Sequence, residues 1–233
     1  MDKSKKYSLR NNKNKQKYTR KNKQPQKTKK YIQELIKIYP ECQHDNAPCQ
    51  KYEGNVITYG EMEYKGIEIF AKNSFQFIGN KSKNIVFFDI GCGNGKIPLY
   101  MSQFPAVKFS YGIELVDIRY NKSIEIQQNL AKKYPEFTKK VEFIHGNMLE
   151  VNFTEKILQH QCIIWISNLC FPAEITKQLF DKLAAEIPVG SVIGCSKYPE
   201  FLPEQTRFES VKNVDIPMSW NQTGSQVHFF RLL

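Results

Sequence analysis

The feature that most constrains the fold of this chain is a regular alternation of short apolar runs and amphipathic stretches from residue 85 onward. The apolar runs are expected to be strands at 85–90, 109–114, 141–145, 163–166 and 192–195. The amphipathic stretches are expected to be helices at 97–104, 117–133, 155–159 and 173–187. Strands that alternate with helices at this pitch predict an α/β protein with a mostly parallel sheet and helices on both faces.

Both ends of the chain depart from this alternation. Near the start, apolar residues at helical spacing predict one helix from Tyr31 and a second at 62–77. Near the end, the runs Val211–Met218 and Gln226–Leu232 flank a polar turn at 221–224. Two strands joined by a turn without an intervening helix predict an antiparallel hairpin at one edge of the sheet.

The positive charge is concentrated in the first 30 residues. The net charge is +11, and residues 1–30 hold thirteen of the 34 Lys and Arg but one of the 23 acids, so the remainder is nearly neutral. This segment has too few apolar residues to offset the entropy of ordering, which predicts a disordered basic tail. Such a tail favours binding to DNA or another polyanion through residues 3–30. A role limited to solubility is the alternative.

The composition excludes several classes of protein. Hydrophobic residues make up 41% of the chain and aromatic residues 13%, which is enough for a core and argues against a wholly disordered protein. No apolar run approaches the roughly 20 residues of a membrane helix, and no secretory signal is expected at the start. The six cysteines have irregular spacing, which indicates a reducing compartment.

A possible metal site lies between the two N-terminal helices. Cys42, His44 and Cys49 fall within eight residues, which is compatible with zinc. No second paired cluster completes such a site, so we interpret these residues as loop residues and predict no metal. The patterns divide the chain into a tail at 1–30, a helical segment and loop at 31–84, and an α/β domain at 85–233.

The sharpest local signal is a glycine-rich turn at 87–96, between an apolar strand and the next helix. Asp89 ends the strand, and glycines follow at positions 91, 93 and 95 before Lys96. Glycine lets the backbone turn tightly and approach a ligand that a Cβ would exclude. A dinucleotide-binding turn would require glycine in place of Lys96, so the observed spacing favours S-adenosylmethionine, with Asp89 bound to its amino-acid part.

Two further strand ends carry polar residues to the same edge of the sheet. Glu114 ends the second strand, 25 residues after Asp89, where a carboxylate is placed to bind both ribose hydroxyls. The third strand is followed by Asn147, whose side-chain carbonyl would accept a hydrogen bond from the adenine amino group, and by Met148, which would pack on the base. A surface turn without a ligand is the alternative for this pair.

The methyl acceptor is expected at the end of the fourth strand, which runs into Ser167, Asn168 and Phe171. Methyltransferases that act on the amino groups of adenine or glutamine carry a proline pair at this point. This chain has no such pair, which argues against those substrates.

Several segments together carry a more specific pattern. They lie at 59–61 (Tyr-Gly-Glu), 87–95, 112–114, 146–149, 166–171, 194–197, 218–220 (Met-Ser-Trp) and 227–230. In this order they resemble the disruptor-of-telomeric-silencing family, the histone-lysine methyltransferases that use a seven-strand fold rather than a SET domain. The resemblance implies a Rossmann-like class I methyltransferase fold with a seven-stranded sheet, in which 85–233 binds S-adenosylmethionine.

The resemblance also implies the site residues. The cofactor-binding residues would be Tyr59, Gly60, Glu61, Met62, Phe87, Asp89, Gly91, Cys92, Gly93, Asn94, Gly95, Lys96, Glu114, Asn147, Met148 and Asn168. Asn168 would hold the methyl donor near the acceptor, and Phe171, Trp220 and Phe229 or Phe230 would wall a narrow lysine channel. Transfer would depend on alignment and exclusion of water, with no indispensable base.

The chain departs from the family at three points. The family usually has Asp at the position of Asn147, two Asn at Ser167-Asn168, and a Tyr pair at Phe229-Phe230. The last two departures touch the acceptor channel. We predict a nuclear, monomeric protein-lysine methyltransferase that acts on histones or nucleosomes. The alternatives are methylation of a non-histone basic protein or ribosomal RNA, and a catalytically weak regulatory subunit that binds S-adenosylmethionine.

Overall fold

The computed structural model describes residues 25–40, 50–52, 55–57, 60–79, 83–201 and 207–233. The chain divides into two compact units, Met1–Pro40 and Glu41–Leu233. Residues 1–24 of the predicted tail lie outside the described residues, as do Cys42, His44 and Cys49 of the metal hypothesis.

The first unit contains one helix, at residues 25–38 within the described part. The helix predicted from Tyr31 is therefore confirmed, but it begins six residues earlier than expected, so 25–30 do not belong to a disordered tail. Pro25 stands at the first helical position, where its missing N–H costs no hydrogen bond and its fixed φ suits the helix. The Gln and Lys residues that follow have high helix propensity. The prediction of disorder was based on the charge and low apolar content of the segment and did not take this propensity into account.

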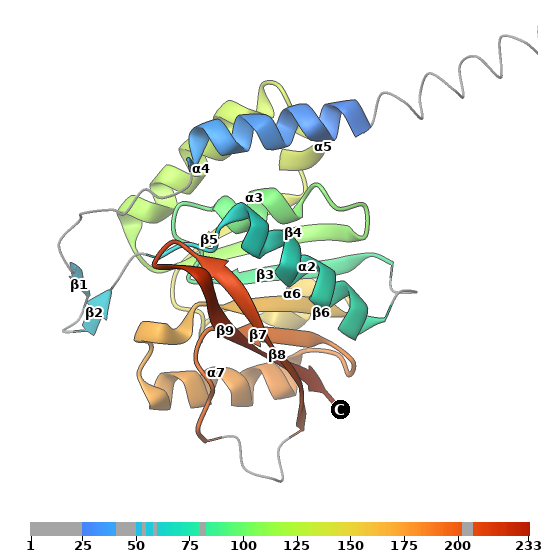
Figure 1. Cartoon of the computed structure of the whole chain (residues 1–233). Coiled ribbons are helices and arrows are strands. Elements are labelled where there is room, and N and C mark those ends of the chain that lie inside the picture. Colours follow the sequence, from blue (N-terminus) through green and yellow to red (C-terminus); the bar gives the residue numbers. More distant parts are fainter. Residues whose placement is uncertain (1–24, 41–49, 53–54, 58–59, 80–82, 202–206) are drawn as a thin grey trace, which may run out of the picture. The chain divides into compact units, whose positions relative to one another are not determined.

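A seven-stranded sheet forms the centre of the second unit (Figure 1). Its strands, in the order β5-β4-β3-β6-β7-β9-β8, are β5 Val141–His145, β4 Val107–Glu114, β3 Ile85–Ile90, β6 Cys162–Ile166, β7 Val192–Cys195, β9 Asn221–Leu232 and β8 Phe208–Met218. The first five are parallel, whereas β9 is antiparallel to both β7 and β8. The predicted mostly parallel sheet with an antiparallel C-terminal hairpin is confirmed. A separate two-stranded sheet pairs β1 Gln50–Tyr52 with β2 Asn55–Ile57.

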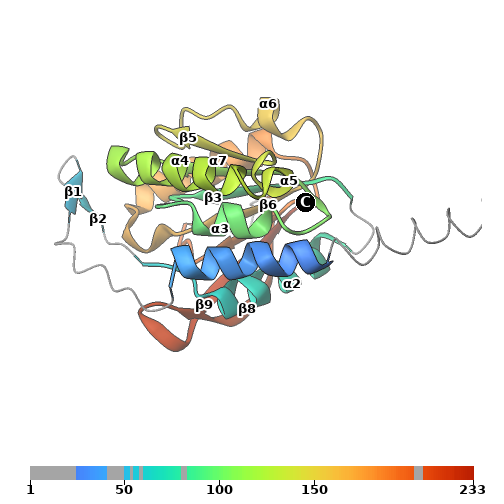
Figure 2. The same cartoon turned by 90° about the horizontal axis from the view of Figure 1, so that it is seen from above.

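Helices cover both faces of the large sheet (Figures 1 and 2). Their bounds are α2 Tyr64–Ile78, α3 Lys96–Met101, α4 Asp117–Ala131, α5 Pro135–Thr138, α6 Phe153–Ile157, the 3₁₀-helix η1 Asn168–Cys170, and α7 Ala173–Glu186. The helices α2, α3 and α4 lie on one face, and α6 and α7 pack on the other. None of the described helices is long and apolar enough to cross a membrane.

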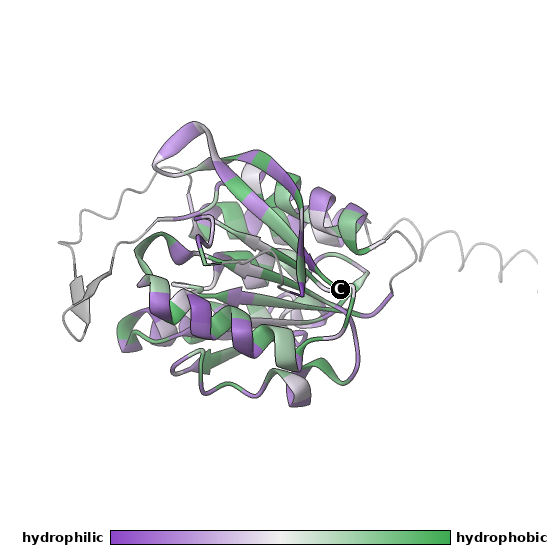
Figure 3. Ribbon diagram, turned by 90° about the horizontal axis from the view of Figure 1, so that it is seen from below, coloured by the Kyte–Doolittle hydropathy of each residue, from purple (hydrophilic) through white to green (hydrophobic). Residues whose placement is uncertain are grey.

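The strand β3 shows why the sequence builds two layers of core. All six of its residues are buried, because both faces of the strand are covered. Val86, Phe88 and Ile90 point toward α6 and α7, whereas Phe87 and Asp89 point toward α2 and α3. In Figure 3 the central strands are mainly hydrophobic, while the covering helices have one polar side.

The helix α2 belongs to the compact unit of the sheet. It packs on β7 and β8 and lies along the hairpin in Figures 1 and 2. The predicted division at residue 84 therefore separates α2 from strands that it covers, and the compact unit instead runs from Glu41 to Leu233.

The hairpin of β8 and β9 turns earlier than predicted. Met218 pairs with Asn221, so Ser219 and Trp220 form the turn. Residues 221–224, which were expected to be the turn, lie in a bulge of β9, where the Asn221 side chain donates to the Gly224 carbonyl at 2.8 Å. Gly224 has a φ of +118°, which side chains with a Cβ rarely adopt, and the local sequence therefore resembles a turn.

Candidate active site

A cavity of about 470 Å³ opens where the carboxyl ends of β3, β4, β5 and β6 meet. The carboxyl ends of parallel strands form the usual ligand-binding edge of such a sheet. The predicted site residues that line the cavity are Gly60, Glu61, Met62, Asp89, Gly91, Cys92, Gly93, Lys96, Glu114, Asn147, Met148, Phe171 and Trp220.

Asp89 is the most unusual group in the cavity. Its side chain is 1% exposed, and neither carboxylate oxygen has a hydrogen-bond partner within the described structure. Burial raises the pKa of Asp89 well above its usual range, and the nearby Glu114 and Glu61 carboxylates raise that pKa further. A buried carboxylate without partners is costly. Asp89 therefore fits a ligand that brings a cation or several hydrogen-bond donors.

Glu114 is held by the backbone of the turns beside it. Its Oε2 accepts a hydrogen bond from the Gly93 amide at 2.7 Å, and its Oε1 accepts one from the Val116 amide at 2.9 Å. Each carboxylate oxygen keeps further acceptor capacity. The bonds fix the carboxylate at the cavity wall, in the position where a ligand with two hydroxyl groups could be bound.

The glycine-rich turn requires glycine for two different reasons. Gly91 has a φ of +80° and lines the cavity. Glycine is needed there because it adopts this backbone conformation readily and leaves the cavity free of a side chain. Gly95 has a φ of +87°, and an added Cβ would lie 2.4 Å from the ring of Phe143. Gly95 does not line the cavity, and its role is to let the turn pack on β5.

Lys96 brings a buried cation to the same cavity. Its Nζ lies 3.1 Å from Oε2 of Glu61, and the two side chains are 5% and 21% exposed. The same Nζ lies 4.6 Å from the centroid of the Tyr64 ring, which favours the cation. The ion pair joins the first residue of α3 to the segment before α2.

Asn147 and Met148 line the cavity as predicted, beyond the end of β5. The side-chain oxygen of Asn147 accepts a hydrogen bond from the Leu149 amide at 3.0 Å, which fixes the direction of the amide group. That oxygen retains one lone pair for a ligand. The pair is therefore compatible with the predicted contact to a purine amino group.

The side of the cavity where the methyl acceptor was expected, called the acceptor side below, is built from η1 and from the tip of the hairpin. Phe171 and Trp220 line it, and Trp220 is 40% exposed. The indole N–H donates to Oγ of Ser225 at 3.0 Å, which orients the ring. The indole lies against Gly60, where an added Cβ would meet its Cζ3 atom at 2.5 Å.

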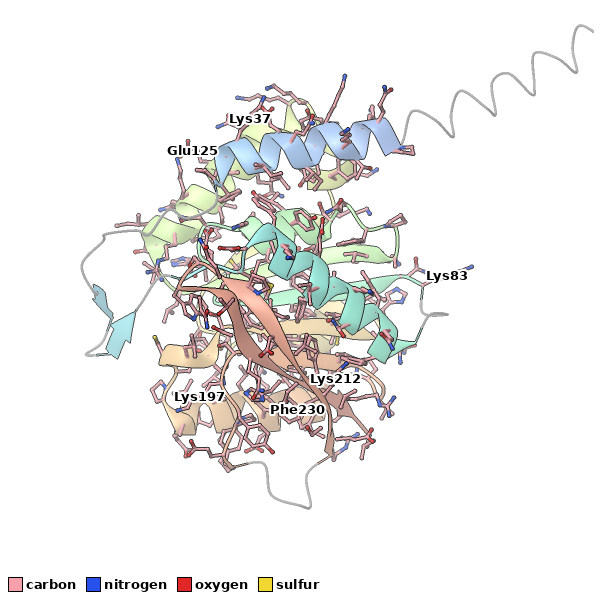
Figure 4. All side chains as sticks on the ribbon, viewed as in Figure 1. Lys37, Lys83, Glu125, Lys197, Lys212 and Phe230 are labelled. Atoms are coloured by element: carbon pink, nitrogen blue, oxygen red, sulfur yellow. The ribbon has the colours of Figure 1, made fainter. Side chains whose placement is uncertain are left out.

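Asn168 does not line the cavity, and its predicted role at the methyl donor is corrected. It is 1% exposed, and its Oδ1 accepts from the Lys197 amide at 2.8 Å and from Oγ of Ser196 at 3.2 Å. Its Nδ2 donates to the Lys197 carbonyl at 3.0 Å. Through these hydrogen bonds the Asn168 side chain connects η1 to the segment after β7. Lys197 in that segment is labelled in Figure 4.

Phe229 and Phe230 do not wall the acceptor channel either. Phe229 is fully buried and stacks on Phe70 of α2 at 5.6 Å between ring centroids. Phe230, labelled in Figure 4, lies on the opposite face, where its ring meets Phe180 of α7 at 5.9 Å. Alternate residues of β9 point to opposite faces of the sheet, and both faces are covered by helices. This pair therefore belongs to the core.

Three other predicted residues fall outside the cavity lining or outside the described structure. Phe87 is fully buried and contacts Phe70 edge-on, so it also belongs to the core. Asn94 lies in the glycine-rich turn but does not line the cavity. Tyr59 lies outside the described residues.

Several lining residues were missed by the sequence reasoning. They are Ile97, Ile113, Leu115, Val116, Arg119, Gly146, Trp165, Ser167, Leu169, Cys170, Pro172 and Ile175. Five of them, Ile113, Leu115, Gly146, Trp165 and Ser167, directly precede or follow the last residue of a predicted strand, and that position was the available signal. No group of three or more His, Cys, Asp or Glu among the described residues could hold a metal ion.

Two sequence comparisons connect the chain to known proteins. The family model described as "Histone methylation protein DOT1" matches residues 42–224. A curated protein of Caenorhabditis elegans, "Histone-lysine N-methyltransferase, H3 lysine-79 specific", is 26% identical over 133 residues. That alignment covers 56% of this chain and only 14% of the relative's length.

Solved structures show the same fold at low sequence identity. An RNA methyltransferase from Salinibacter ruber, in complex with S-adenosylhomocysteine, is 13% identical, with a TM-score of 0.53 over 73% of this chain and 92% of that chain. TrmK of M. capricolum, also with S-adenosylhomocysteine, is 15% identical, with a TM-score of 0.53 over 73% of this chain and 68% of that chain. The predicted Rossmann-like methyltransferase fold is confirmed. Because the family model also matches most of the chain, this protein belongs to the family described as Histone methylation protein DOT1.

Proposed function

We propose that this chain is an S-adenosylmethionine-dependent protein-lysine methyltransferase that acts on histones. Family membership supports the class of reaction. The observation that carries the assignment of the site is Asp89, a buried carboxylate without partners in a cavity at the carboxyl edge of the sheet.

The residues of the cavity fit the parts of this cofactor. The ammonium group of its amino-acid part would supply Asp89 with the cationic partner that the structure does not provide. Glu114 would accept hydrogen bonds from the two ribose hydroxyls, and Asn147 and Met148 would bind the adenine. When bound, S-adenosylmethionine supplies an electrophilic methyl group on a sulfonium.

The acceptor side would receive the lysine side chain in its neutral form. Phe171 and Trp220, with Leu169, Pro172 and Ile175, offer a mainly apolar surface. Desolvation by such a surface disfavours the ammonium form of lysine, and contact with the rings partly offsets this effect. Phe171 and Trp220 would hold the neutral amine in line with the donor. S-adenosylmethionine would supply the methyl group and leave with the electrons of the broken carbon–sulfur bond, and the proton of the methylated ammonium would pass to bulk solvent after the transfer. Alignment and exclusion of water then account for catalysis without a dedicated base.

The basic N-terminal segment would anchor the enzyme to its substrate. Residues 1–24 hold ten Lys and Arg and one acid, which suits the DNA of a nucleosome. A nuclear location and a monomeric state complete the proposal. Deletion of 1–24 should lower nucleosome affinity and flatten its dependence on salt, while S-adenosylhomocysteine affinity stays constant. An unchanged salt dependence would contradict the anchoring role.

A labelling assay tests the function. The full chain is incubated with tritiated S-adenosylmethionine and, separately, with nucleosomes, free histones, ribosomes and total RNA. We expect label on a histone lysine, and much less label with Asp89→Asn at a donor concentration that does not saturate the variant. Label that appears only in RNA or in ribosomal protein would overturn the histone proposal. Binding of S-adenosylhomocysteine without transfer to any substrate would favour a regulatory subunit.

A further inference from the structure

The segment Gly60–Met62 is attached to the tip of the β8–β9 hairpin, although the two are far apart in the sequence. The Glu61 amide donates to Oγ of Ser219 at 3.0 Å, and the Ser219 amide donates to the Glu61 carbonyl at 2.8 Å. Met62 and Met218 form an antiparallel bridge. With the Trp220 ring packed against Gly60, the segment and the hairpin tip form one wall on the acceptor side.

The Glu61 side chain leaves this wall and pairs with a residue of the donor side. Its partner, Lys96, begins α3 directly after the glycine-rich turn that holds Asp89, and Lys96 lines the same cavity. The low exposure of both side chains, 5% and 21%, places the pair where electrostatic attraction is only weakly screened. Removal of one partner from such a pair leaves the other charge poorly compensated.

Lys96 also contacts the helix that follows the segment. Its Nζ lies over the ring of Tyr64, the first residue of α2. One cation of the donor side therefore contacts the chain on both sides of Met62. Loss of that cation should increase the mobility of the segment Gly60–Met62 and of Trp220, which packs against it.

We propose that Lys96 is a positioning residue whose ion pair with Glu61 holds Trp220 and the acceptor wall against the donor site, so that donor binding and acceptor binding are coupled. This inference rests on the proposed function for the identity of the donor and the acceptor. The amino-acid part of the donor brings an ammonium and a carboxylate beside Asp89, Lys96 and Glu61, so its binding changes the electrostatic environment of the pair. By linkage, the acceptor must affect donor affinity by the same factor.

The first test follows the indole of Trp220 without any ligand. The chain has two tryptophans, so labelling with 5-fluorotryptophan gives two fluorine resonances, and Trp220→Phe assigns them. Lys96→Met should shift and broaden the Trp220 resonance more than that of Trp165, which lies on β6. Lys96→Arg should restore the resonance, because arginine keeps the charge. An unchanged Trp220 resonance in folded Lys96→Met protein would overturn the proposal.

The second test separates positioning from binding of the cofactor. With nucleosomes as acceptor, Lys96→Met should raise the KM of the acceptor about 5- to 20-fold, which is typical of coupling between two sites. The KM should change more than kcat, and Glu61→Gln should have the same effect. The double variant should be no worse than either single variant if the two residues act as one unit. A full sum of the two effects would overturn the proposal.

A matched control is available on α7. Lys182 pairs with Glu186, and these side chains are 20% and 23% exposed, but neither residue lines the cavity. Lys182→Met should leave the Trp220 resonance and the acceptor KM unchanged. If Lys96→Met weakens only S-adenosylhomocysteine binding, Lys96 is a cofactor ligand and the coupling is refuted. If the unmodified chain does not bind S-adenosylhomocysteine, the proposed function fails, whereas the Trp220 resonance still reports on the ion pair.

Discussion

The donor side and the acceptor side of the cavity are built in different ways. On the donor side, Asp89 and Glu114 are themselves buried and project directly from the carboxyl ends of the adjacent strands β3 and β4, and backbone amides fix Glu114. On the acceptor side, η1 and the hairpin tip carry the lining residues, and Leu169 and Trp220 are 47% and 40% exposed. The donor side is local and rigid, whereas the acceptor side is assembled from distant segments through a few contacts.

The difference explains how one scaffold can keep its cofactor and change its substrate. Residues at the ends of buried strands cannot move without disturbing the core. Residues of η1 and the hairpin tip belong to short surface segments, whose sequence can change with little loss of stability. The following predictions test how independent the two sides are.

The largest effect is expected on the donor side, from Asp89→Asn. Loss of a charge-assisted contact should weaken S-adenosylhomocysteine binding by about 10- to 150-fold, from the usual strength of hydrogen bonds to charged groups. Isothermal titration calorimetry measures this. Asn168→Asp serves as a control from the acceptor side and should change the affinity little. Equal losses in the two variants would show that the two sides are not independent.

The same substitution should alter the dependence of stability on pH. Burial, followed by Glu114 and Glu61, raises the pKa of Asp89 in the folded protein above its ordinary value of 3.8. The contribution of Asp89 to stability is then fully present below that ordinary value and is lost as pH rises through the folded pKa. Urea unfolding of the ligand-free protein at several pH values should show this loss, and Asp89→Asn should remove it. A parallel pH dependence in both proteins would contradict the prediction.

On the acceptor side, Gly60→Ala should displace Trp220, because the added Cβ would lie 2.5 Å from the indole. We expect the acceptor KM to rise about tenfold, since overpacking commonly costs 1–3 kcal/mol. Steady-state kinetics with nucleosomes measures the change. Trp220→Ala should give a similar KM, and the double variant should add little, because both substitutions remove the same contact. Additive effects would place Gly60 and Trp220 in separate roles.

Asn168→Ala should destabilise the protein by about 2 kcal/mol, because two backbone groups of Lys197 would lose their partner. Urea denaturation measures the free energy of unfolding. Asn168→Asp keeps the oxygen that accepts from the Lys197 amide but places a second oxygen against the Lys197 carbonyl, so it should also destabilise the protein. If Asn168→Ala abolished methyl transfer without any loss of stability, Asn168 would act on the reacting groups after all.

The smallest effect is expected from Phe229→Leu, which changes the core beneath α2. A volume-reducing substitution that stays apolar should lower the free energy of unfolding by about 1 kcal/mol. The acceptor KM should change by less than about twofold, because Phe229 does not line the cavity and has no contact with the acceptor. A large rise in KM at unchanged stability would return Phe229 to the lysine channel.

The sequence predicted the local parts of this protein well. The bounds of β3, β5 and β7 were predicted to the residue. For β3 and β7 the reason is that buried parallel strands are mainly continuous apolar runs, whereas the edge strand β5 alternates buried and exposed residues. The cavity position of the glycine-rich turn and of Glu114 was also predicted, since the turn follows one strand and Glu114 ends the next.

The parts that depend on contacts between distant segments were not predicted as well. The hairpin turn was placed at 221–224, because a bulge with Gly224 has the same local composition as a turn. By resemblance, Phe229 was assigned to the lysine channel and Asn168 to the methyl donor. In the structure Phe229 packs on helix α2, and Asn168 is hydrogen-bonded to the segment after β7. Whether a side chain is buried in the core depends on packing between distant segments, which a local sequence pattern does not predict.

The hydrogen bonds between Glu61 and Ser219 join residues 158 positions apart in the sequence. A contact of such long range forms late in folding, since the intervening chain must first be ordered. As the polypeptide leaves the ribosome, the parallel strands that bear Asp89 and Glu114 are complete well before the hairpin emerges. The wall that Trp220 shares with Gly60 can close only after the hairpin has left the ribosome, so the nascent protein acquires a place for its donor before it acquires a place for its substrate.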